Sequence, residues 1–146
     1  MVKYFGYGAN RDAMMMAAVI GRMPDGEQMV LQDYELRILP WKQIPKPARD
    51  VLKNAWSSSF SSYVVSKKVG ARVSGTLWSL KKEELLLVDR WELVPKWYRR
   101  KLVKVGNRKI HCQIVESGGQ VVDGMNYQTY LNEPEQMYLV AALNRR

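Results

Sequence analysis

The stretch VKYFGYGANRDAMMMAAVI, at residues 2–20, decides how this 146-residue chain begins to fold. Its first part, Val2 to Tyr7, is β-branched and aromatic and leads into Gly8, which predicts a strand that ends in a turn. Asn10 then stands where a helix cap is expected, before a helix from Arg11 to about Ile20. The chain therefore opens with a strand, a glycine turn and a helix.

The rest of the chain carries more strand signals and two further helices. The pair Gly106-Asn107 is a strong hairpin signal, and Asn132 stands where the last helix is expected to begin. This mixture is typical of an α+β fold with a mixed sheet that could curl into a barrel. Strands are expected at Val30–Leu39, Phe60–Val65, Arg72–Trp78, Tyr98–Val105 and Ile110–Val115, and helices at about Lys81–Trp91 and around Met137, Val140 and Ala141.

Composition places the chain, of 16.9 kDa with 47% hydrophobic and 25% charged residues, among ordinary globular domains. We expect one domain over residues 1–146. Lys and Arg number 23 against 14 Asp and Glu, so the net charge is +9 and favours an anionic partner, either nucleic acid or a small carboxylate. Neither a signal peptide nor about eighteen consecutive apolar residues is evident, so no membrane span is expected and the cytoplasm is the expected compartment.

Histidine and cysteine are scarce, which limits the chemistry. His111 and Cys112 are the only residues of their kinds. A metal site of the usual type would lack ligands, and strand neighbours point to opposite faces, so these two cannot form a dyad. We expect a buried cysteine, a surface or edge histidine, and no metal or cofactor. An enzyme built from this chain would work with carboxylates, tyrosines and backbone amides.

The turn from Tyr7 to Asn10 is the first candidate site. A glycine-containing turn before a helix leaves backbone N–H groups unpaired, and these groups can hold a carboxylate or an oxyanion. Turns of this composition also occur as plain connectors. The turn alone therefore leaves both interpretations open.

Glu92 is the second candidate. With Leu85 and Val88 it follows the i, i+3, i+7 spacing, which places it within about 20° of Leu85 around the expected helix and directs it towards the interior. Partial burial and a position at the negative end of the helix should both raise its pKa, as a proton-transfer group needs. The alternative is a solvated helix end at which Asp89 and Glu92 only pair with nearby basic residues such as Arg100.

Together these segments resemble a known family. The run YFGYGAN at residues 4–10 resembles the "Y-F-x-Y-G-S-N" signature of the γ-glutamylcyclotransferase-like (AIG2-like) superfamily. The runs GTLWSL at residues 75–80, LVDRWE at 87–92 and YRR at 98–100 resemble its central block, in order and at similar spacing. Asn126–Tyr130, Pro134 and Tyr138 are similar to its C-terminal close. The resemblance covers most of the chain except roughly Trp41 to Ser59.

The resemblance implies a small barrel with about three flanking helices and an enzyme that releases 5-oxoproline from a small anionic γ-glutamyl compound. The substrate's own α-amine would attack its γ-carbonyl carbon, and Glu92 would act as general base and acid. Backbone N–H groups of the turn would bind the α-carboxylate or the developing oxyanion. The residues implied to bind substrate are Tyr7, Gly8, Ala9, Asn10, Tyr98 and Tyr127.

Departures from the family pattern leave the substrate open. Ala9 replaces the usual serine and Arg11 an apolar residue, and either change could alter the substrate. The leaving group could be an amine, an amino acid or a related amide. The role of the stretch from Pro40 to Ser59 is also open. Its proline-rich part, Pro40 to Pro47, could form a lid, although a surface excursion is the simpler expectation.

The alternative function is a basic, non-catalytic module for nucleic acid or another anion. Arg99–Lys101, Lys104, Arg108 and Lys109 lie along one expected hairpin, with Trp97 and Tyr98 close by. On a strand these charges fall on both faces rather than in one stripe. A solvated hairpin is therefore the simpler explanation, and nucleic acid is the less favoured partner.

Overall fold

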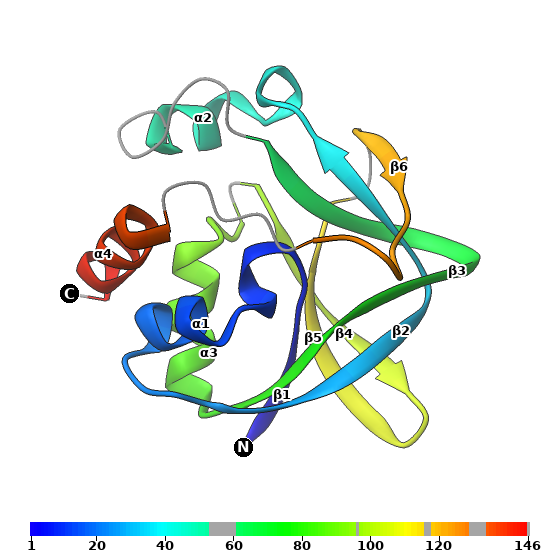
Figure 1. Cartoon of the computed structure of the whole chain (residues 1–146), viewed down its shortest axis with the longest axis horizontal. Helices are drawn as coiled ribbons and strands as arrows, with labels where there is room; N and C mark the ends of the chain where they lie inside the picture. The colour runs from blue at the N-terminus through cyan, green and yellow to red at the C-terminus, as the bar shows by residue number, and fades with distance from the viewer. Residues whose placement is uncertain (53–60, 96, 116–117, 129–133, 146) are drawn as a thin grey trace.

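The computed structural model describes residues 1–52, 61–95, 97–115, 118–128 and 134–145, and it contains one six-stranded sheet with helices on one side (Figure 1). The strand order is β4-β5-β1-β3-β2-β6. The strands are β1 (Val2–Gly6), β2 (Asp25–Leu39), β3 (Ser62–Leu80), β4 (Arg99–Val105), β5 (Arg108–Ile114) and β6 (Gln120–Val122). The helices are α1 (Ala13–Ile20), α2 (Lys46–Leu52), α3 (Lys82–Trp91) and α4 (Pro134–Asn144), with short 3-10 turns η1 (Gly8–Arg11) and η2 (Trp41–Gln43).

The sheet is mixed and strongly curved. β1 lies antiparallel to β3 on one side and parallel to β5 on the other. The sheet curls so far that Val115, directly after β5, also reaches β3, although β1 lies between these two strands in the sheet. The Val115 N–H donates to the Val65 carbonyl at 3.2 Å, and Ser66 Oγ donates to the Val115 carbonyl at 2.6 Å. These contacts confirm the expected α+β fold with a sheet curled towards a barrel.

β3 is one strand of 19 residues, where two separate strands were expected. The polar residues between the two apolar runs lie where β3 bulges away from β2. Its pairing moves from Arg72 opposite Gln32 to Lys67 opposite Tyr34, and the Gly70 N–H donates to Asp33 Oδ1 at 3.0 Å. The prediction was wrong because a bulge interrupts the polarity pattern without ending the strand.

Two apolar clusters lie on opposite faces of the sheet. Because side chains alternate along a strand, Tyr4 faces the helices and Phe5 faces the inside of the curl. Met15 and Met16 of α1 are buried in the first cluster, while Met14 is exposed. Cys112 is buried in the second cluster, as expected.

Three local expectations need correction. α1 begins at Ala13 and is capped by Asp12, whose carboxylate accepts from the Met15 N–H at 2.8 Å; Asn10 is not the cap because its side chain is used elsewhere. β2 begins at Asp25, five residues before the expected start at Val30.

The segment Lys46–Leu52 forms the helix α2, where an irregular segment was expected. A proline lies in its first turn, where no backbone N–H is needed. The expected cap at residue 132 and the stretch 53–59 lie outside the described residues.

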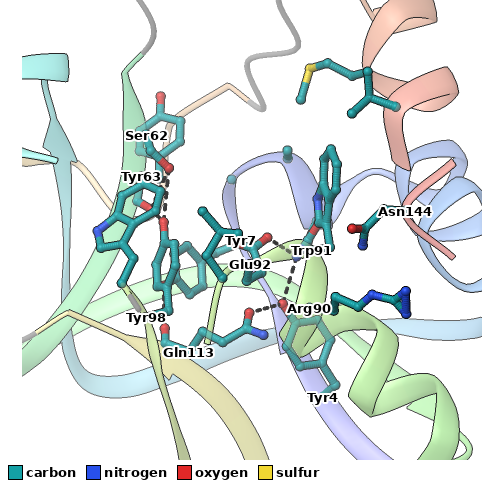
Figure 2. A pocket seen from close by; sticks show the side chains of 17 residues that line it. Tyr4, Tyr7, Ser62, Tyr63, Arg90, Trp91, Glu92, Tyr98, Gln113 and Asn144 are labelled. Atoms are coloured by element: carbon teal, nitrogen blue, oxygen red, sulfur yellow. Dashed lines mark hydrogen bonds between the residues drawn. The ribbon is translucent and has the colours of Figure 1, made fainter. Parts of the chain in front are cut away.

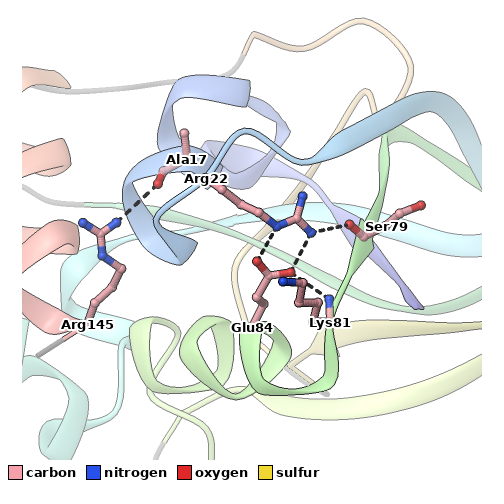
Figure 3. Close-up of polar contacts among 6 residues, drawn as sticks. All are labelled: Ala17, Arg22, Ser79, Lys81, Glu84 and Arg145. Atoms are coloured by element: carbon pink, nitrogen blue, oxygen red, sulfur yellow. Dashed lines mark hydrogen bonds and ion pairs between the residues drawn. The ribbon is translucent and has the colours of Figure 1, made fainter.

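Arginine contacts fix the helices relative to one another (Figure 3). Arg22 after α1 forms a two-pronged ion pair with Glu84 of α3, with N–O distances of 2.6 and 2.7 Å. Arg145 after α4 donates to the carbonyls of Ala17 and Ala18 at the end of α1. Together they hold α3 and α4 against α1. In the part of the chain described here, every helix is too short or too polar to cross a membrane.

Candidate active site

A cavity of about 160 Å³ lies where the turn after β1, the end of α3 and the helix α4 meet (Figure 2). Strands β3 and β5 close its other sides. Residues from five separate segments therefore share one pocket. They include Tyr4, Tyr7, Gly8, Ala9, Asn10, Ser62, Tyr63, Arg90, Trp91, Glu92, Trp97, Tyr98, Gln113, Met137 and Val140.

The turn Tyr7–Asn10 is held tightly against the sheet. The Trp78 indole N–H donates to the Asn10 carbonyl at 2.8 Å. A Cβ on Gly6 would lie 2.2 Å from that same oxygen, so only glycine allows this approach. Gly8 has a φ of 61°, a conformation that favours glycine. The glycines at positions 6 and 8 therefore allow the geometry that presents Gly8, Ala9 and Asn10 to the pocket.

Glu92 caps the C-terminal end of α3 and extends into the pocket. Leu85 and Val88 on the same face of α3 are buried, as their spacing predicted. Asn10 Nδ2 donates to Glu92 Oε1 at 2.7 Å. The pKa of Glu92 is raised from 4.5 to about 7: burial is the main cause, the hydrogen bond from Asn10 opposes the rise, and the charge of Asp89 adds to it. A carboxyl with this pKa can both take up and release a proton near neutral pH.

A chain of hydrogen bonds continues from Glu92 along the floor of the pocket (Figure 2). Asn10 Nδ2 also donates to the Tyr4 hydroxyl at 2.9 Å, and that hydroxyl donates to Gln113 Oε1 at 2.6 Å. Asn10 and Gln113 are each only 2% exposed. Even so, Asn10 Oδ1 and Gln113 Nε2 are buried and have no hydrogen-bond partner among the described residues.

Sequence reasoning missed Tyr4 and Gln113. Tyr4 lies in an apolar strand, where a tyrosine is more simply explained as core. Gln113 follows the alternation of apolar and polar residues in β5, RKIHCQI, which predicts an exposed side chain and gives no signal for a pocket residue. Ser62, Tyr63 and Trp97 were also missed, because no motif connects them to the pocket.

Tyr98 lies in the pocket, as the resemblance implied. Its hydroxyl donates to the Tyr63 carbonyl at 2.6 Å and lies 3.0 Å from Ser62 Oγ. Its ring packs on Trp97 with centroids 4.5 Å apart. Burial raises the pKa of Tyr98 well above its usual value, so the phenol stays neutral and supplies a wall rather than a charge.

Tyr127 lies behind the pocket and is not among its lining residues. Its ring packs edge-on against Tyr63 at 5.3 Å, and its hydroxyl donates to the Ser74 carbonyl at 2.6 Å. The Arg11 guanidinium lies 4.3 Å from the ring centroid and donates to the Tyr127 carbonyl at 3.1 Å. Arg11, one of the departures from the family pattern, therefore stacks against Tyr127 and joins it to the turn.

The basic hairpin formed by β4 and β5 carries several ion pairs. Arg100 Nε donates to both oxygens of Asp89 at 2.9 Å, and its Nη1 lies 2.8 Å from His111 Nδ1. Arg108 pairs with Glu27. Asp89 thus has the basic partner that the solvated-helix alternative predicted. Glu92 instead accepts a hydrogen bond from Asn10. His111 is half-buried. Its pKa is lowered mainly by burial and, to a smaller extent, by the positive charge of Arg100.

Comparison with known proteins agrees with the fold. A solved structure named gamma-glutamyl cyclotransferase is 18% identical, with a TM-score of 0.59 over 82% of this chain and 69% of that one. A crystal structure of an uncharacterised protein from Homo sapiens is 19% identical, with a TM-score of 0.56 and the same coverage. At this identity the likeness shows the fold alone. No curated protein sequence matches significantly. Residues 4–135 match the family model described as gamma-glutamyl cyclotransferase, AIG2-like, and the chain belongs to that family.

Proposed function

We propose that this chain releases 5-oxoproline from a γ-glutamyl amide, with Glu92 moving the protons. The family and the fold indicate a γ-glutamyl cyclotransferase-like activity. The observation that carries the proposal is Glu92 itself: a carboxyl at the centre of a pocket, held by Asn10 at 2.7 Å, with a pKa of about 7.

The reaction needs no nucleophile from the protein. Ionised Glu92 takes a proton from the substrate's α-ammonium, and the freed α-amine attacks the γ-carbonyl carbon to form a five-membered ring. Protonated Glu92 then gives that proton to the leaving nitrogen as the amide C–N bond breaks, and takes the second proton from the ring nitrogen, which becomes the lactam N–H. Glu92 passes this second proton to the released amine. The products are 5-oxoproline and an ammonium ion, and Glu92 is again ionised.

Positioning is the main task of the pocket, because an attack within one molecule already has a high effective molarity when its chain is held bent. The aromatic walls from Tyr7, Trp97 and Tyr98 leave a space in which a bent γ-glutamyl group would be confined. The backbone N–H groups of Ala9 and Asn10 are the donors we assign to oxygen atoms of the substrate, because the Gly8 backbone already interacts with the Tyr127 hydroxyl. The net charge of +9 favours the approach of an anionic compound.

A panel of γ-glutamyl compounds tests this proposal. The panel includes γ-glutamyl amino acids, γ-glutamyl amines and γ-glutamyl-lysine amides, with 5-oxoproline measured by mass spectrometry. We expect turnover of at least one class. We expect Glu92→Gln to lower kcat by about 100-fold or more, because general acid and base catalysis contributes about that factor.

The matched control is Glu83→Gln, which makes the same change on the exposed side of α3. Circular dichroism checks that both variants keep the fold. Activity retained in Glu92→Gln, or lost equally in Glu83→Gln, would contradict the role of Glu92. A panel without turnover would contradict the proposed reaction.

A further inference from the structure

The floor of the pocket holds two polar atoms that the proposed mechanism does not use. Within the described part of the chain, Asn10 Oδ1 and Gln113 Nε2 are both buried and both lack a hydrogen-bond partner, in side chains that are each 2% exposed. A buried polar group without a partner is costly, so such groups are rare in folded proteins. Two of them in one pocket indicate a ligand that completes their bonding.

We infer that the side chains of Gln113 and Asn10 bind the α-amino acid end of the substrate, Gln113 donating to the α-carboxylate and Asn10 accepting from the α-ammonium. The inference rests on the proposed function, because it takes a γ-glutamyl compound as the ligand. It assigns the carboxylate to a side chain on β5 and leaves the N–H groups of the turn for the developing oxyanion.

The hydrogen-bond chain fixes which atom of each amide is free. An ionised Glu92 can only accept, so Asn10 must present its NH₂ group to it. The second N–H of that group is then donated to the Tyr4 hydroxyl, which leaves the hydroxyl hydrogen for Gln113 Oε1. Gln113 is thereby oriented with its NH₂ group unpaired. The free groups are an acceptor on Asn10 and a donor on Gln113.

Along the pocket floor, the free acceptor on Asn10 and the free donor on Gln113 follow the same order as the ammonium and the carboxylate of an amino acid. Asn10 Oδ1 belongs to the side chain that touches Glu92, so an ammonium that gives its proton to Glu92 also lies within reach of an acceptor. Gln113 lies two hydrogen bonds further on, of 2.9 and 2.6 Å. A carboxylate on the carbon next to the ammonium would extend in that direction, towards the donor.

Depth supports the same assignment. Tyr4 and Gln113 form the most buried part of the pocket, with exposures of 1% and 2%, whereas Arg90 lines it and is exposed. A closed floor accepts a group of constant size, and the α-amino acid end is constant in every γ-glutamyl compound. The leaving group varies and must depart, so it belongs at the open side.

Binding of two lactams tests the inference without relying on turnover. L-5-oxoproline and 2-pyrrolidinone share one ring, and only the first has a carboxylate. We would measure both dissociation constants by ligand-observed NMR for the unmodified protein, Gln113→Glu and Gln113→Met. The matched control is Gln32→Glu, which makes the same charge change at an exposed position of β2.

The unmodified protein and Gln32→Glu should prefer 5-oxoproline. Gln113→Glu keeps an acceptor for Tyr4 but opposes a carboxylate, so the preference should fall by about 10- to 100-fold, the range for a lost hydrogen bond to a charged group. Gln113→Met, which adds no buried charge, should also lose the preference. In both variants the affinity for 2-pyrrolidinone should change by less than about threefold.

Three results would overturn the inference. These are a preference retained in either folded Gln113 variant, an equal loss of affinity for both lactams, and an unmodified protein that does not prefer 5-oxoproline. If that protein still releases 5-oxoproline from the γ-glutamyl panel, only the assignment of Gln113 and Asn10 fails. If it neither binds a lactam nor turns over the panel, the proposed function fails as well.

Discussion

Replacing Glu92 by glutamine should make the protein more stable at neutral and alkaline pH, even as it removes the proposed catalytic group. The pKa of Glu92 rises from 4.5 to about 7 on folding, chiefly because of burial. At about 1.4 kcal/mol for each pH unit, that interval corresponds to about 3 kcal/mol. Because the side chain is partly open to the pocket, we expect about 2 kcal/mol after solvent screening.

The sign follows from the order in which the two states lose their proton. Below pH 4.5 the carboxyl is protonated in both the folded and the unfolded state, so it does not lower the free energy of unfolding. Between 4.5 and about 7 the unfolded chain ionises while the folded protein stays protonated, so the free energy of unfolding falls as pH rises. Above about pH 8 both are ionised and the loss is complete. Glutamine does not titrate, so the variant escapes this loss.

Urea unfolding followed by tryptophan fluorescence measures the effect at a series of pH values from about 4.5 to about 8.5. The quantity to plot is the free energy of unfolding of Glu92→Gln minus that of the unmodified protein, with Glu83→Gln as the control. We expect the difference to grow by about 2 kcal/mol across the series for Glu92 and to stay flat for Glu83. A flat line for Glu92→Gln would refute the buried, high-pKa carboxyl.

Three further outcomes follow from the structure. Asn10→Ala removes the hydrogen bond that lowers the pKa of Glu92, so the acid limb of kcat/KM should move to higher pH; a shift to lower pH would contradict this role. Gly6→Ala places a Cβ 2.2 Å from the Asn10 carbonyl, and we expect the free energy of unfolding to fall by about 2 kcal/mol in urea titrations, where a loss below about 0.5 kcal/mol would count against the packing. In fluorescence anisotropy at about 100 mM salt we expect no tight binding of duplex DNA, whereas submicromolar binding that weakens steeply with salt would favour the basic-module alternative.

The parts of the site that could be predicted from the sequence are those with a periodic or local signal. Glu92 follows Leu85 and Val88 on one helix face, and the glycines of the YFGYGAN run mark a turn, so both candidates could be named in advance. The mixed, curled sheet was expected from the order of strands and from the family resemblance, and the structure confirms it.

The rest depends on contacts between distant segments. The capping prediction failed because Asp12 caps α1, which leaves Asn10 to join Tyr4 and Glu92. Gln113 could not be recognised because the apolar and polar alternation of β5 predicts an exposed side chain, whereas both faces of the strand are covered near its end and Cys112, Gln113 and Ile114 are all buried. Tyr127 was assigned to the pocket on its place in a motif, yet Tyr63 lies in the wall in front of it.

The length of β3 also affects how the protein opens. One uninterrupted strand carries Ser62 at the pocket and Leu80 before α3, and it pairs with β2 over most of its length. Opening the pocket wall at Ser62 and Tyr63 would disturb the adjoining Val64 and Val65, which are fully buried and pair with β2. In hydrogen exchange, we expect these amides to be released only through the global unfolding of the protein, with the same denaturant dependence as the sheet centre. The pocket and its scaffold would then form a single cooperative unit.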